Sequence, residues 1–158
     1  MRDDAELLLR SLSEILTAKL SLLRAIRAEE TNGRYYLKSE DTDRLAQSID
    51  RCTGLVADTD VLDFDAAAVR ASLARVLGVQ AGGLHPFLRT VSGSAVEAYL
   101  AVQADILEET RALKDGHDRL VEEIESRFRS MENERRSLAA LGRVLGIDAI
   151  RDPRDPSS

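Results

Sequence analysis

The stretch LLRSLSEILTAKLSLLRAI, residues 8–26, decides the fold of this chain. Its apolar residues recur at intervals of three and four, at Leu9, Leu12, Leu16, Leu23 and Ile26. This spacing places the side chains on one stripe of an α-helix, and such a stripe has to be buried against other helices. Lys19 stands where one more apolar residue is expected, either to fix the packing register or to extend to solvent.

Comparable ladders recur along the chain, with almost no strand pattern between them. They comprise Leu45, Ile49, Cys52 and Val56; Val69, Leu73, Val76 and Leu77; Val91, Tyr99, Val102, Ile106 and Leu113; and Leu120, Ile124, Phe128, Met131, Leu138, Leu141 and Leu145. Aromatic residues are 4% of the chain and Trp is absent, a composition suited to aliphatic seams between helices. The sequence therefore predicts an all-α fold, an antiparallel helical bundle of about four to five long amphipathic helices.

Breaker residues between the ladders predict where the first helices end. Asn32-Gly33 ends the first helix near Thr31, or Tyr35, Tyr36 and Leu37 continue it as a frayed turn before Ser39. Ser39 or Asp41 caps the second helix. Four acidic residues at 58–65 mark a polar corner before a short third helix.

Two glycines set the remaining boundaries. Gly78 ends the short helix as a C′ residue. Gly116 either breaks or bends the C-terminal helical part, or lies inside one continuous helix at a cost of about 1 kcal/mol relative to alanine. We expect one helical-bundle domain over 1–150, with a hairpin over 3–58, a short helix over 65–77, a loop over 78–86, helices over 87–146 and a disordered tail over 151–158.

Charge and composition exclude several classes of protein. The formal net charge of −6 argues against nucleic-acid binding, which needs a basic face. Apolar runs are too short to predict a membrane span, and the acidic start Asp3-Asp4 does not resemble a signal peptide. Cys52 is the single cysteine and sits on an apolar ladder, which indicates a small core residue in a reducing compartment. We expect a cytoplasmic protein.

The sequence contains no recognisable catalytic, cofactor or metal motif. The acidic corner at 58–65 lacks the glycine at position 6 and the glutamate at position 12 of a calcium loop, whether the loop starts at Asp58 or at Asp60. His85 and His117 lack the Glu three residues before them that a di-metal bundle site uses. The glycines at 78–83 lack the strand and the Lys-Ser or Lys-Thr of a phosphate loop. We therefore expect a protein that is not an enzyme, with no catalytic residues, no metal and no cofactor.

Two groups of residues are candidates for binding a protein partner. Tyr35 and Tyr36, at the tip of the first hairpin, either anchor a partner or pack over the end of the bundle. A C-terminal apolar ladder either closes the core or binds a partner helix; it comprises Leu138, Leu141, Val144, Leu145 and Ile147.

One segment has a familiar pattern. A helix with Leu-x-x-Leu spacing is followed by Glu29-Glu30, then by Leu37-Lys-Ser-Glu-Asp-x-Asp-x-Leu45, and by a return helix that ends near Leu62-Asp63. Residues 12–63 thus resemble the N-terminal hairpin of FlgN-type flagellar export chaperones. The family's Asn-rich last helix and Tyr-containing tail are not matched, since 131–135 contains one Asn and the chain ends Pro-Ser-Ser.

The resemblance implies a small, acidic, cytoplasmic helical protein that holds hook–filament junction subunits before type III export. Its partner would be a protein client, bound through the C-terminal helix. The alternative is a structural or adaptor bundle that self-associates as a homo-oligomer or pairs with another coiled coil.

Overall fold

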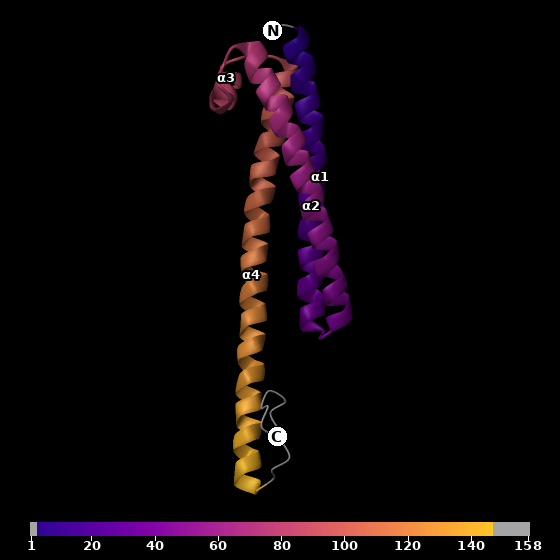
Figure 1. Ribbon diagram of the computed structural model, residues 1–158, viewed down its shortest axis with the longest axis vertical. Coiled ribbons are helices and arrows are strands. Elements are labelled where there is room, and N and C mark those ends of the chain that lie inside the picture. Colours follow the sequence, from indigo (N-terminus) through magenta and orange to yellow (C-terminus); the bar gives the residue numbers. More distant parts are fainter. Residues whose placement is uncertain (1–2, 147–158) are drawn as a thin grey trace, which may run out of the picture. The chain divides into compact units, whose positions relative to one another are not determined.

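The computed structural model describes residues 3–146, and every regular element within them is helical. The elements are α1 (Asp3–Lys38), α2 (Thr42–Leu77), the 3₁₀-helix η1 (Ala81–Gly83), α3 (Leu84–Leu88) and α4 (Ser94–Leu145) (Figure 1). The predicted all-α helical bundle is confirmed. The chain divides into two compact units, one over 1–118 and one over 119–158.

The core of the first unit lies where α1, α2, α3 and the first turns of α4 meet. Helices α1 and α2 form an antiparallel hairpin (Figure 1). The most deeply buried large side chains are Leu9, Leu12, Leu16, Leu73, Leu84, Leu88, Val96 and Tyr99. Aliphatic side chains that leave water in this way are worth about 1.5–3 kcal/mol each. The five residues of the N-terminal ladder are all buried, as their spacing predicts.

Lys19 interrupts the apolar ladder, and the adjacent Leu20 is buried in its place. Leu20 is buried at 5% exposure, while the ammonium group of Lys19 lies 2.5 Å from the Asp63 carboxylate of α2. The long Lys19 stem therefore borders the core while its charge forms an interhelical ion pair.

Of the two ends expected for the first helix, the one near Thr31 is wrong, because α1 continues through Asn32-Gly33 and the two tyrosines to Lys38, just before Ser39. Gly33 is buried against α2, and an added Cβ would meet the Leu45 Cδ1 at 3.7 Å and the Ser48 Oγ at 3.8 Å. Glycine weakens a helix by about 1 kcal/mol, but here it lets the second helix approach closely. Packing thus overrides the local signal.

The expected polar corner at 58–65 and separate short helix over 65–77 are also wrong, because both lie inside α2. No glycine or proline occurs between 55 and 77, and aspartate disfavours a helix only mildly. Thr59 and Ala66 are buried on the inner face, so the helix continues while Asp58 and Asp60 point to solvent. Asp58 and Asp60 thus lie on the exposed side of one long helix, whereas Asp63 faces α1 and pairs with Lys19.

The inner face of α2 is rotated from the predicted ladder. Ile49 and Val56 are 53% and 47% exposed, whereas the adjacent Ser48 is buried and Leu55 is half-buried. Cys52 is half-buried, as a core-edge residue would be. Small polar residues on the seam allow α1 and α2 to pack closely, so hydrophobicity alone misplaces the face.

Both caps of α2 agree with the sequence. The Asp41 carboxylate accepts a hydrogen bond of 3.1 Å from the Arg44 N–H at the start of the helix. Gly78 ends the helix with φ +70°, and its N–H and that of Val79 are directed to carbonyls of the last turn. The predicted loop over 78–86 is partly helical, since η1 and the first residues of α3 lie within it.

Helix α4 runs from Ser94 to Leu145 and continues through Gly116, which is one of the alternatives that the sequence left open. A Cβ at Gly116 would meet the Glu30 Oε2 of α1 at 3.3 Å. The absence of a side chain thus accommodates the carboxylate of α1, and the helix tolerates the glycine. The single domain expected over 1–150 stays a prediction, and the tail over 151–158 lies outside the described residues.

Candidate partner-binding surfaces

The C-terminal segment of α4, residues 119–145, carries an exposed apolar stripe. Leu138 is 57% exposed, Leu141 53% and Leu145 60%. They are three and four residues apart, so they lie along one face of the helix. Apolar side chains of this size in a row favour contact with another apolar surface. We call the row Leu120, Ile124, Met131, Leu138, Leu141 and Leu145 the C-terminal stripe; Leu120 and Ile124 are half-buried, and the other four residues are exposed.

Met131 and Phe128 are the most exposed apolar side chains in the middle of this segment. Met131, within the stripe, is 64% exposed, and Phe128 beside it is 68% exposed. Neither was among the predicted site residues, although the same spacing rule would have included them. Large flexible and aromatic side chains are frequent at sites where proteins bind one another.

The outer residues of the predicted ladder differ in position. Val144 is 82% exposed and lies about 120° around the helix from Leu138. It therefore borders the stripe next to Leu141 rather than lying along it. Ile147 lies outside the described residues.

Ion pairs within the helix stabilise the segment between the apolar residues. The Glu132 carboxylate lies 3.3 Å from the Arg135 guanidinium and 3.1 Å from that of Arg136. Hydrogen bonds from Arg135, and then from Arg136, lower the pKa of Glu132. Oppositely charged residues at these spacings favour the helix, although solvent screens pairs as exposed as these.

The two tyrosines at the hairpin tip are held differently. The Tyr35 ring is 66% exposed and meets the Tyr36 ring edge-to-face at 5.8 Å between centroids. The Arg44 guanidinium of α2 lies 6.0 Å from the centre of the half-buried Tyr36 ring. Tyr36 thus packs across the tip, and Tyr35 remains accessible to a partner.

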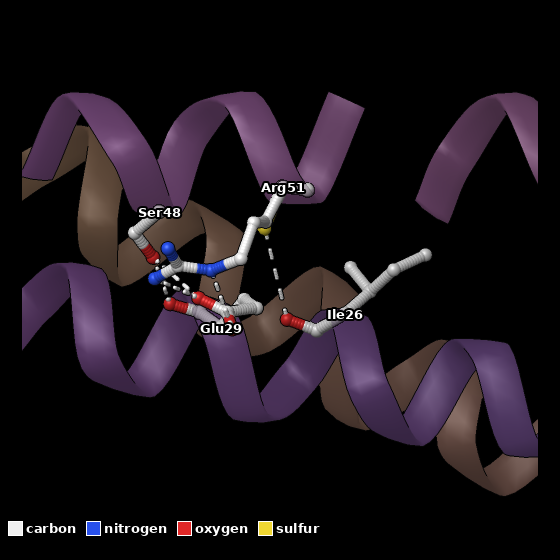
Figure 2. A network of polar contacts seen from close by, with 5 residues as sticks. Ile26, Glu29, Ser48 and Arg51 are labelled. Carbon is white, nitrogen blue, oxygen red and sulfur yellow. Dashed lines mark hydrogen bonds and ion pairs between the residues drawn. The ribbon is translucent and has the colours of Figure 1, made fainter. Parts of the chain in front are cut away.

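A polar network joins α1 to α2 in the middle of the hairpin (Figure 2). Arg51 donates two hydrogen bonds to the Glu29 carboxylate, at 3.0 and 3.1 Å, and the buried Ser48 hydroxyl donates to the same residue at 2.9 Å. The hydrogen bond from Arg51 is the main cause that lowers the pKa of Glu29. The network fixes how the two helices align.

Cys52 borders this network and behaves as a packing residue. Its Sγ lies 3.9 Å from the Ile26 carbonyl oxygen (Figure 2). Burial, followed by the nearby Glu30 and Glu29 carboxylates, raises the pKa of the thiol. A thiol that stays protonated is a poor nucleophile, so this geometry does not favour covalent chemistry.

Two carboxylates join α1 to the first part of α4. Glu109 is 6% exposed, and its carboxylate lies 2.9 Å from the Arg27 guanidinium and 4.0 Å from that of Arg24. The Glu30 carboxylate lies 3.5 Å from the His117 Nδ1. Burial raises the pKa of Glu30, although His117 acts in the opposite direction. These contacts could not be predicted from the sequence, since nothing in helical spacing indicates which acids face inward.

Within residues 3–146, no group of three or more His, Cys, Asp or Glu side chains is arranged to hold a metal ion. Among the described helices, none has the length and apolar content needed to cross a membrane. Among the predicted partner-binding residues, Leu138, Leu141, Leu145 and Tyr35 are exposed apolar or aromatic side chains.

The chain was compared with family models, curated proteins and solved structures, and it matched none of them.

Proposed function

We propose that this chain is a non-enzymatic binding protein that shields an amphipathic helix of a partner protein on its C-terminal stripe. The observation that carries the proposal is the exposure of Leu138, Leu141 and Leu145 along one face of α4. A client helix that covered these residues would remove apolar surface from water, at about 25 cal/mol per Å² before ordering costs. Such binding needs neither ATP nor a catalytic group.

The kind of client follows from the resemblance of residues 12–63 to FlgN-type chaperones. We propose a cytoplasmic role in type III export, in which the chain holds hook–filament junction subunits before secretion. The acidic net charge of −6 is compatible with this role. The stripe lies in the helix through which that family is expected to bind clients.

A substitution within the stripe tests the proposal. Leu141→Asp places a carboxylate in the proposed interface, and it should weaken capture of a junction subunit about 100-fold or more, since both apolar burial and charge desolvation are affected. Size-exclusion chromatography of the mixed proteins should show a soluble stoichiometric complex for the wild type and none for the variant. Titration calorimetry gives the ratio of affinities.

Ala140→Asp is the matched control, because it introduces the same charge at the neighbouring exposed position on another face of the helix. It should bind as the wild type does. Circular dichroism has to show unchanged helicity and melting for both variants. A wild-type chain that ignores the subunits, or a Leu141→Asp variant that binds normally, would contradict the proposal. If Leu141→Asp unfolds the protein, the leucine belongs to a core and the stripe is not the binding surface.

The second candidate function is an adaptor that pairs through a coiled coil. It is favoured by the alternating spacing of four and three from Leu120 to Leu145, which fits a heptad seam through Ile124, Arg127, Met131, Glu134, Leu138 and Leu141. An adaptor of this kind would not respond to junction subunits in the chromatography experiment.

A further inference from the structure

We propose that two copies of this chain pair through residues 120–145 as an antiparallel coiled coil. The inference goes beyond client capture, because it concerns the chain without any client. It rests on the exposed stripe in α4 and on two charged residues that interrupt its seam.

The seam alternates in steps of four and three, so Arg127 and Glu134 fall on it between apolar residues. In a parallel pair each seam residue faces its own copy. Arg127 would then lie opposite Arg127 and Glu134 opposite Glu134, at the centre of the interface. Like charges in such a position disfavour the pair and leave both groups poorly solvated.

In an antiparallel pair neither charged residue faces its own copy: the two Arg127 levels lie about 16 Å apart along the axis, and the two Glu134 levels lie about 4.5 Å apart, on successive layers. When Ile124 faces Leu141 of the second copy, Leu120 faces Leu145 at either end. In the middle, Arg127 then faces Leu138, and Met131 faces Glu134. In an antiparallel pair of identical helices, the numbers of two facing residues add to a constant, which is 265 in this register.

The same register brings opposite charges together. The level of Arg127 is one layer, about 6 Å along the axis, from the level of Glu134 of the second copy. Side chains as long as arginine and glutamate bridge that distance, and the symmetry of the pair produces the contact twice.

The flanking segments favour the same orientation. Residues 119–126 contain three glutamates and one arginine, whereas 139–146 contain Arg143 and no acidic residue. An antiparallel pair places these segments side by side, while a parallel pair places the acidic segment beside its own copy. Charges at such distances are only partly screened at physiological salt.

Disulfide trapping in the full chain tests the orientation. In a Cys52→Ala background, Ile124→Cys and Leu141→Cys are prepared separately, one of them with a tag that changes its mass. Under mild oxidation the mixture should form the mixed disulfide, and each variant alone should form none. Homodisulfides in the separate variants would show parallel pairing and overturn the proposal.

Two measurements make the test independent of the cysteine variants. Sedimentation of the wild-type chain should show a concentration-dependent monomer–dimer equilibrium, and a strictly monomeric chain would overturn the proposal. Glu134→Arg should weaken the dimer at least about tenfold, and the added substitution Arg127→Glu should restore it. Failure of that rescue would refute the proposed register.

The outcome is separable from that of the proposed function. A monomeric chain that captures junction subunits would overturn the pairing alone. A dimer that ignores those subunits would overturn the chaperone function alone. When both hold, added subunits should dissociate the dimer, because client and second copy use the same stripe.

Discussion

At the scale of single residues, the carboxylates inside the first unit differ in what burial does to them. Glu109 is almost completely buried, yet it lies between two arginines that are half exposed. Within the described residues its Oε1 has no aligned hydrogen bond, so Arg27 acts on it as a nearby charge. The pair therefore links α4 to α1 mainly through charge attraction.

We expect Glu109→Ala to lower the free energy of unfolding by about 1–2 kcal/mol, because two arginines lose their partner and a small cavity forms. Glu108→Ala is the matched control, since Glu108 is exposed and one residue away. It should change stability by less than about 0.5 kcal/mol. Urea unfolding followed by circular dichroism measures both, and equal effects would mean that Glu109 has no special role.

At the scale of elements, the α1–α2 hairpin is aligned by its polar network rather than by leucines alone. The Glu29 carboxylate accepts two hydrogen bonds from the Arg51 guanidinium and a third from the Ser48 hydroxyl (Figure 2). Paired hydrogen bonds of this kind are geometrically demanding and specify one alignment of two helices. The network should therefore titrate with Glu29.

Because the pKa of Glu29 is lowered from its ordinary value of 4.5, the folded state binds its proton less readily than the unfolded state does. The stability that it contributes is complete above that value and is lost as pH falls through the lower, folded-state pKa. Glu29→Gln should reduce stability by about 1 kcal/mol at pH 7 and by less in acid. Urea midpoints compared at pH 7 and near pH 3 test this, and a constant difference between variant and wild type would contradict it.

The helices also show which parts of the fold the sequence can predict. Leu9, Leu12 and Leu16 were identified correctly because a regular apolar spacing defines a buried face wherever a partner exists. Gly33 was misread, and Gly116 left the course of the helix open, because a glycine signals a break locally while its role here depends on a neighbouring helix. The aspartates of α2 were misread for a related reason. Aspartate disfavours a helix only mildly, and the packing of the buried face of α2 outweighs that effect.

At the scale of the whole molecule, the same limit applies to the candidate site. Leu73 and Leu141 lie on similar ladders, and spacing places both on an apolar face. Only the structure distinguishes them, because Leu73 is fully buried whereas Leu141 is 53% exposed. A sequence ladder identifies a surface that needs covering, but which element covers it depends on long-range packing.

The two units should therefore differ in how their helices are stabilised. Residues 5–26 belong to a packed core, so their amide protons should be protected at any protein concentration. Residues 120–145 carry the exposed side chains of the C-terminal stripe, and most of the stability of a helix in water comes from burial of its apolar face. Their protection should depend on a second copy or on a client.

Hydrogen exchange of the full chain, measured by mass spectrometry at several concentrations, tests this difference. Dilution below the dimer dissociation constant should accelerate exchange over 120–145 and leave 5–26 unchanged. Addition of a junction subunit should restore protection over 120–145, because the proposed client would cover the same stripe. Slow exchange over 120–145 at every concentration, with and without the subunit, would mean that this helix is stable without a partner. That result would contradict the prediction that binding stabilises it.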